Sequence, residues 1–148
     1  MKKALFFVLL ISVTSAIADH DIPGTYLWNQ NKLDKLVIDE SLHVKTTLVM
    51  RDYTIFARTP LVFPHRLRWN ELKNVFTTSG YYSFVYSYYG RLIRCQFPIE
   101  MEADSYGEGR FLDVTLSYPP QFGLNAWGQC AYFGLASEPL AFEKITVP

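Results

Sequence analysis

The chain contains two cysteines, Cys95 and Cys130, and their pairing is the most direct covalent chemistry open to it. A redox or metal role favours a Cys-x-x-Cys spacing or a nearby group of histidines, and the sequence has neither. In an oxidising compartment one intramolecular disulfide is expected, and closing that loop stabilises a fold by roughly 3–4 kcal/mol. We therefore predict a structural staple between two strands.

Catalytic and metal-binding patterns are sparse in this sequence. The imidazole groups are those of His20, His43 and His65, and none belongs to a spaced motif such as His-Glu-x-x-His. No Gly-x-Ser-x-Gly nucleophile elbow is present. We predict no metal, no cofactor and no enzymatic activity, with a hydrolase built from dispersed residues as an open alternative.

Charged residues cluster in two places without forming a recognised site. The acidic cluster lacks the Asp-x-Asp-x-Asp-Gly order of a calcium loop; it comprises Glu100, Glu102, Asp104 and Glu108. A basic excess between Arg51 and Lys73 could receive an acidic partner, although such charges usually form a solvated face; it comprises Arg51, Arg58, Arg66, Arg68 and Lys73.

The most unusual segment is an aromatic run from Tyr81 to Tyr89, which holds half of the ten tyrosines. In a strand, alternate side chains share a face, so one face carries Tyr82, Phe84, Tyr86 and Tyr88. Such a stripe can be packed core, the wall of a ligand cavity, or an exposed binding patch. The sequence leaves these three interpretations open.

Period-two alternation dominates the elements that must position these residues. It is clearest over residues 91–101, where the odd positions from Ile93 to Met101 are apolar and the even positions mostly polar, and it recurs over Phe111–Tyr118. Other strands are predicted at Gly24–Asn29, Lys35–Asp39, Leu42–Met50, Tyr53–Arg58, Tyr81–Tyr89, Gln129–Gly134 and Leu140–Thr146. Eight or nine short strands predict an all-β, antiparallel barrel or sandwich.

One segment favours a different structure. Leu72, Val75 and Phe76 follow the i, i+3, i+4 spacing of a helix face behind a potential cap at Asn70. We therefore allow one short helix over residues 70–76.

The N-terminal eighteen residues have the pattern of a Sec-type signal peptide. Lys2 and Lys3 precede an apolar run, and Ala16-Ile17-Ala18 forms a small-x-small cleavage site. We expect a single domain over residues 19–148 in a bacterial periplasm or outside the cell.

No later apolar run is long enough to span a membrane as a helix. Without Lys2 and Lys3 the acidic residues exceed the basic ones by two, which gives no argument for binding nucleic acid.

The two ends of this domain carry a family resemblance. Gly24-Thr25-Tyr26, followed by Leu36-Val37-Ile38, resembles the opening of the calycin barrels, the lipocalins and avidins, with Tyr26 in place of their usual tryptophan. The resemblance implies that Phe142 and Lys144 supply aromatic and basic packing partners in the last strand. It also implies an antiparallel barrel with an internal cavity, and it identifies no ligand.

We therefore expect an exported, non-enzymatic binding domain for a small apolar or aromatic ligand. Its wall would be the stripe Tyr82, Phe84, Tyr86 and Tyr88, with Trp28 or Trp127 near the mouth. The alternative is a protein-binding module, such as an inhibitor or immunity protein for an exported or periplasmic enzyme. In that case the stripe would be exposed beside the basic segment.

Overall fold

The computed structural model describes residues 22–49 and 61–146, and within them the chain is all-β with no helix. The predicted signal peptide, His20 and the strand expected at Tyr53–Arg58 lie outside the described residues. Ten strands are present: β1 (Gly24–Trp28), β2 (Lys35–Ile38), β3 (Val44–Thr46), β4 (Arg68–Asn70), β5 (Val75–Tyr88), β6 (Arg91–Tyr106), β7 (Phe111–Tyr118), β8 (Gln121–Leu124), β9 (Cys130–Phe133) and β10 (Ala136–Lys144).

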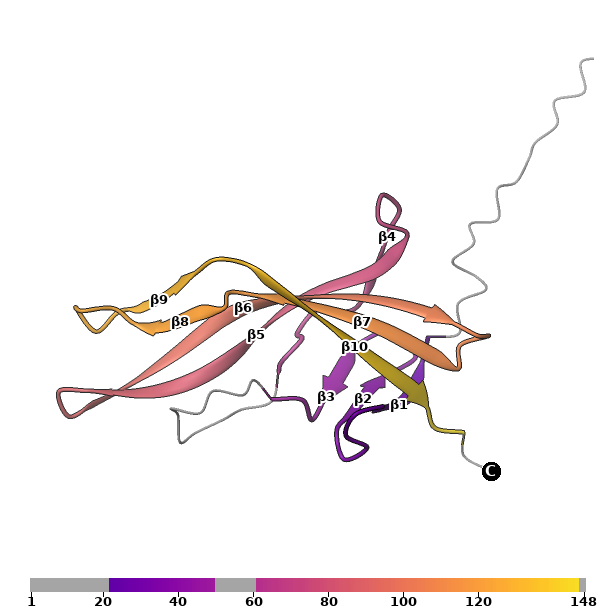
Figure 1. The fold of residues 1–148 in the computed structure, drawn as a ribbon, viewed down its shortest axis with the longest axis horizontal. Helices are drawn as coiled ribbons and strands as arrows, with labels where there is room; N and C mark the ends of the chain where they lie inside the picture. Colours follow the sequence, from indigo (N-terminus) through magenta and orange to yellow (C-terminus); the bar gives the residue numbers. More distant parts are fainter. Residues whose placement is uncertain (1–21, 50–60, 147–148) are drawn as a thin grey trace, which may run out of the picture.

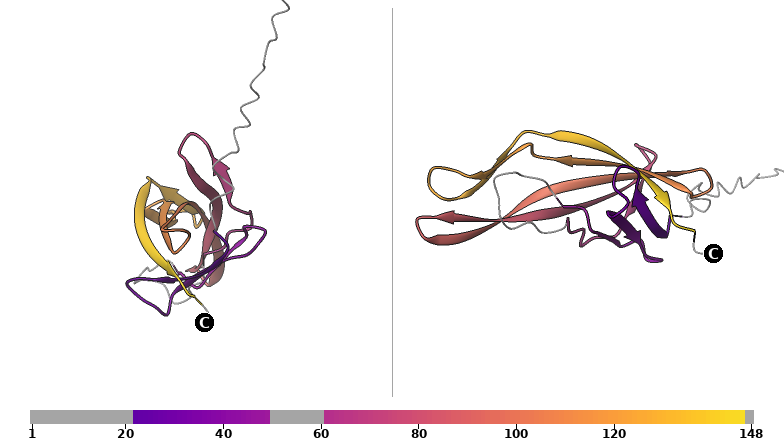
Figure 2. Two further views of the ribbon diagram at one scale, coloured as in Figure 1. Left: turned by 90° about the vertical axis from the view of Figure 1, so that its right-hand side faces the viewer. Right: turned by 60° about the horizontal axis from the view of Figure 1, so that its bottom comes forward.

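Eight of these strands form one antiparallel sheet in the order β3-β2-β1-β10-β7-β6-β5-β4. The sheet curls into a half-barrel, which is seen from its end in the left view of Figure 2. Strands β8 and β9 form a separate two-stranded sheet. The predicted all-β antiparallel class is therefore confirmed, in the form of a half-barrel with a small additional sheet.

A segment without regular pairing, residues 61–67, bridges the two sides of the half-barrel. The amide of Leu61 donates to the carbonyl of Leu48, 2.9 Å away, just beyond β3. The next residue, Val62, exchanges two hydrogen bonds of 2.9 Å with Tyr81 of β5. The amide of Leu67 then donates to Leu42, at 2.8 Å. These bonds satisfy backbone groups that curling the sheet would otherwise leave unpaired.

The core follows from the alternation of the long strands. In β6 the odd-numbered side chains from Cys95 to Ser105 are buried and the even-numbered ones mostly exposed, in line with the predicted alternation. In β7 the side chains of Leu112, Val114 and Leu116 are buried on the same inner face. Tyr26 of β1 and Phe142 of β10 complete one end of this core, and both are almost fully buried.

The short helix expected at residues 70–76 is wrong, because these residues form the turn of a β4–β5 hairpin. Asn70 does cap a turn, since its side-chain oxygen accepts a hydrogen bond from the amide of Lys73, at 3.1 Å. Asn74 has a φ of 55°, which a helix does not permit, and Leu72 is 99% exposed. The apolar spacing instead pairs Phe76 with Trp69 across the strands, with ring centroids 5.0 Å apart.

Two long hairpins extend beyond the half-barrel, as Figure 1 shows on its left side. Strand β6 pairs with β5 along most of its length but with β7 only from Glu100 onward. Strand β7 ends at Tyr118, and after Pro119 and Pro120 the chain continues as β8 and returns through β9. We call residues 81–98 and 119–135 the arm.

We expect Gly80→Ala to weaken the closure of the half-barrel. A Cβ atom at Gly80 would lie 2.0 Å from the backbone oxygen of Val62, so the bridge between Val62 and Tyr81 could not form as it does. The free energy of unfolding should fall by about 2 kcal/mol, which corresponds to about 5–10 °C in a thermal melt. Ser79→Ala, at the neighbouring exposed position, is the matched control, and equal melting of the two variants would contradict this account.

Candidate functional site: a disulfide-locked aromatic arm

The inner end of the aromatic stripe is packed between the two hairpins of the arm. Tyr82 is fully buried and Phe84 is 1% exposed. Phe84 stacks on Phe122 of β8, with ring centroids 5.3 Å apart and planes only 8° from parallel. Phe97 of β6 lies 5.1 Å from the same ring, and Tyr82 meets it edge-on at 5.3 Å. These four side chains are the aromatic cluster, and they join β5 and β6 to β8.

The outer end of the stripe reaches the tip of the arm. Tyr86 is half-buried, with its ring 6.4 Å from that of Phe84. The hydroxyl of Tyr88 donates to the backbone oxygen of Ala126, 2.9 Å away, and its ring lies directly against Gly128. The turn after β5 therefore contacts the turn after β8. Two predicted site residues, Tyr88 and Trp127, are brought to the same end of the molecule, whereas Trp28 lies in β1 of the half-barrel.

The buried hydroxyl of Tyr82 ties the aromatic cluster to the base of the arm. It donates to the backbone oxygen of Pro119, 3.4 Å away, where the chain leaves β7 for β8. Burial raises the pKa of this phenol far above its ordinary value, with a smaller contribution from Tyr86. Tyr82 therefore stays neutral at physiological pH and acts as a buried hydrogen-bond donor.

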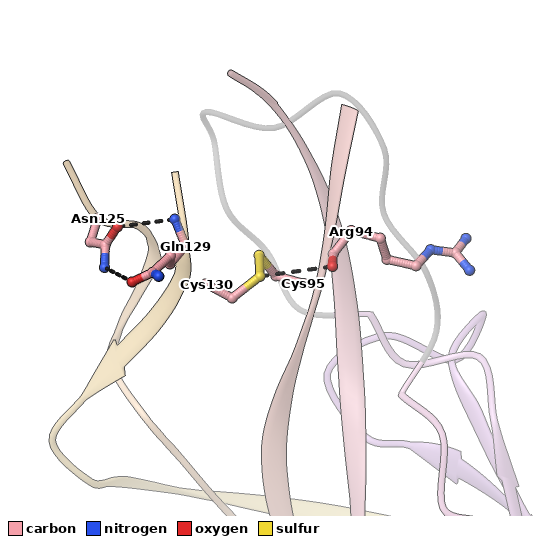
Figure 3. The surroundings of a disulfide bond; sticks show 5 residues. All are labelled: Arg94, Cys95, Asn125, Gln129 and Cys130. Atoms are coloured by element: carbon pink, nitrogen blue, oxygen red, sulfur yellow. Dashed lines mark hydrogen bonds between the residues drawn. A yellow bond between two sulfur atoms is a disulfide. The ribbon is translucent and has the colours of Figure 1, made fainter. Parts of the chain in front are cut away.

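The predicted staple is confirmed: Cys95 of β6 and Cys130 of β9 form a disulfide with Cα atoms 5.6 Å apart. Figure 3 shows this bond crossing from the β8–β9 hairpin to β6. The adjoining turn is ordered by Asn125, whose side-chain oxygen accepts hydrogen bonds from the amides of Trp127 and Gln129, both at 3.0 Å. The arm is thus held by a covalent bond, a ring cluster and a hydrogen-bonded turn.

The outer surface of the arm is rich in exposed apolar side chains. Twelve large apolar side chains are exposed among the described residues, and six of these belong to the arm. The arm makes up under a third of the described residues. Five are between 73% and 90% exposed, and Tyr132 is 58% exposed; the five are Tyr89, Leu92, Trp127, Phe133 and Leu135. Apolar side chains gathered in this way are typical of interaction surfaces.

The charged side chains of the arm are all positive. Residues 81–98 and 119–135 contain no aspartate or glutamate, and their charged residues are Arg91 and Arg94. Both arginines are exposed on β6, beside the exposed Leu92. The acidic side chains of β6 begin at Glu100, where this strand joins the main sheet. Arginine, tryptophan and tyrosine are the residue types enriched among those that contribute most to the binding energy of protein interfaces.

Several residues of this surface were missed by sequence reasoning. Leu92, Tyr132, Phe133 and Leu135 carry no motif, and β8, which supplies Phe122, was not predicted. The available signal was the absence of acidic residues from two segments linked by the cysteine pair. Tyr89 lay within the aromatic run, but at its end.

The other candidate groups do not assemble into a reactive site within residues 22–49 and 61–146. His43 is exposed and lies 3.7 Å from Asp39 in a turn. His65 borders a hollow of about 500 Å³ that also contains Thr78 and Glu102, yet Thr78 donates to the backbone of His65, and Glu102 pairs with Lys73 at 2.6 Å. In these ranges no three His, Cys, Asp or Glu residues are grouped to hold a metal ion, and no helix could span a membrane.

Comparisons with family models, curated proteins and solved structures returned no match for this chain. The calycin resemblance therefore stays a prediction. At the chain ends, Lys144 of β10 lies opposite Tyr26 of β1, with its Nζ atom 5.5 Å from the centroid of the tyrosine ring. A ligand held by the stripe also stays a prediction, because Tyr82 and Phe84 contact other rings, and the hollows described here are lined by other residues.

We expect Cys95→Ala/Cys130→Ala to loosen the arm more than the half-barrel. The cysteines are 35 residues apart, so losing the cross-link should lower the free energy of unfolding by about 4 kcal/mol. In hydrogen exchange, the amides of β8 and β9 should lose more protection than those of β1, β2 and β10. Equal loss of protection throughout the molecule would contradict the separate role that we assign to the disulfide.

Proposed function

We propose that this protein is an exported binding domain whose arm docks onto a partner protein that presents acidic groups beside an apolar surface. The observation that carries the proposal is the pairing of exposed aromatic side chains with Arg91 and Arg94 on an arm without acidic residues. Export is supported by the signal-like N-terminal pattern and by the disulfide, which forms and persists in oxidising compartments.

Rigidity supports this use of the arm. Binding costs conformational entropy for each side chain and loop that becomes ordered in the complex. The disulfide, the aromatic cluster and the hydrogen bond from Tyr88 to Ala126 already hold the two hairpins together before any partner arrives. A projecting and preorganised pair of turns suits a concave partner, so we propose an inhibitor or immunity protein for an exported or periplasmic enzyme as the specific role.

A protein partner fits the arm better than a lipid surface. Anionic membranes recruit clusters of basic residues, each worth about 1 kcal/mol, and the arm has only two arginines. The turn that carries Trp127 also holds two neutral polar side chains, Asn125 and Gln129, of the kind found at the hydrogen-bonded rim of a protein interface.

Site-specific photocrosslinking in the producing cells tests this proposal. We expect a photoreactive phenylalanine analogue at position 127 to give a protein adduct of discrete mass. The same analogue at position 72, on the β4–β5 turn, serves as the control and should give none, although Leu72 is 99% exposed and Trp127 only 78%. Arg91→Glu/Arg94→Glu should weaken binding of the identified partner by at least about tenfold, because it reverses both charges on the arm.

Two results would contradict the proposal. One is the same adducts from positions 127 and 72, which would indicate non-specific proximity. The other is lipid adducts alone from position 127, which would indicate that the arm contacts a membrane.

A further inference from the structure

A second feature lies in the half-barrel, away from the arm. A hollow of about 330 Å³ lies at the side where β10 runs past the end of β1. Its apolar lining is formed by four leucines that are 4–8% exposed, with Trp28 beside them; the leucines are Leu48, Leu61, Leu116 and Leu140. This volume is at the lower end of the range for ligand pockets, so it suits a small molecule.

The charged residues that line the hollow are acidic. Asp34 and Glu138 both line it, and the residues described around it include no lysine, arginine or histidine. The ion pairs found among residues 22–49 and 61–146 involve other carboxylates, those of Asp39, Glu102 and Glu143. The hollow therefore combines an apolar lining with two carboxylates that have no cationic partner among residues 22–49 and 61–146.

Neutral donors orient both carboxylates without cancelling their charge. The side-chain nitrogen of Asn31 donates to Asp34, at 2.8 Å. The hydroxyl of Tyr118 donates to Glu138, at 3.4 Å. Burial and then the negative charge of Glu138 raise the pKa of the Tyr118 hydroxyl, so this group remains a neutral donor. A cation entering the hollow would meet two positioned acceptors and, among the described lining residues, no competing positive group.

We propose that this hollow binds a small molecule in which a protonated amine is joined to an apolar or aromatic body. The body lies against the leucines and the ring of Trp28, and the ammonium group faces Asp34 and Glu138. Charge complementarity selects this class of ligand, because an anion of the same shape would be repelled by both carboxylates. This inference is independent of the docking role of the arm.

The test uses three probes with the same phenyl body: 2-phenylethylamine, 2-phenylethanol and 3-phenylpropionate. Each is titrated at neutral pH into the ¹⁵N-labelled chain over residues 19–148, and the indole N–H signal of Trp28, assigned with Trp28→Phe, is followed by NMR. We expect a saturable shift with the amine, at least about tenfold tighter than with the alcohol, and none with the carboxylate. The indole signals of Trp69 and Trp127 provide internal controls.

Variants separate the role of charge from that of shape. Glu138→Gln, at an exposed position, should weaken binding of the amine without changing the weak binding of the alcohol. Asp34→Asn/Glu138→Gln should remove the preference for the amine, whereas Arg91→Glu/Arg94→Glu on the arm should leave it unchanged. No saturable shift with the amine, or equal shifts with the amine and the carboxylate, would overturn the proposal.

Discussion

The arm depends on the contact between two hairpins that share no strand pairing at that point. Phe122 of β8 fits among Tyr82, Phe84 and Phe97, and each aromatic pair contributes about 0.5–1.5 kcal/mol beyond the burial of its surface. The disulfide beside this cluster limits how far the hairpins can separate in the unfolded chain. Without both features, β8 and β9 would be an isolated two-stranded sheet, which is only marginally stable in water.

The same arrangement divides the molecule into a supporting part and a presenting part. The half-barrel buries its apolar residues on the inner face of the sheet, and residues 61–67 bridge its two sides. The arm buries Tyr82, Phe84 and Phe97 in the aromatic cluster and leaves other apolar side chains, including Trp127 and Phe133, in solvent. Exposing these residues gives no benefit to folding, and their concentration on the arm is the reason that we propose a docking role for it.

The sequence predicted local features well and long-range ones poorly. Alternation placed β7 at its observed bounds, and the cysteine pair was expected, because both depend on simple local or covalent rules. Strand β8 is four residues long and contains Gly123, so it shows too little alternation to be recognised. Whether the stripe is packed or exposed could not be predicted, because its burial depends on Phe122. Phe122 contacts Phe84 only because of the path that the chain takes after Pro119. The helical spacing at residues 70–76 gave a wrong prediction of a helix, because Leu72 is exposed in a turn and does not pack against the core.

The central claim is that the arm is rigid before it meets a partner, and backbone ¹⁵N relaxation on the free protein tests it most directly. For a rigid arm we expect order parameters of about 0.85 for the amides of Tyr88, Trp127 and Tyr132, equal to those of β1 and β10. Order parameters below about 0.6 throughout the arm, with the disulfide intact, would contradict it, because the exposed aromatics would then be mobile and not preorganised.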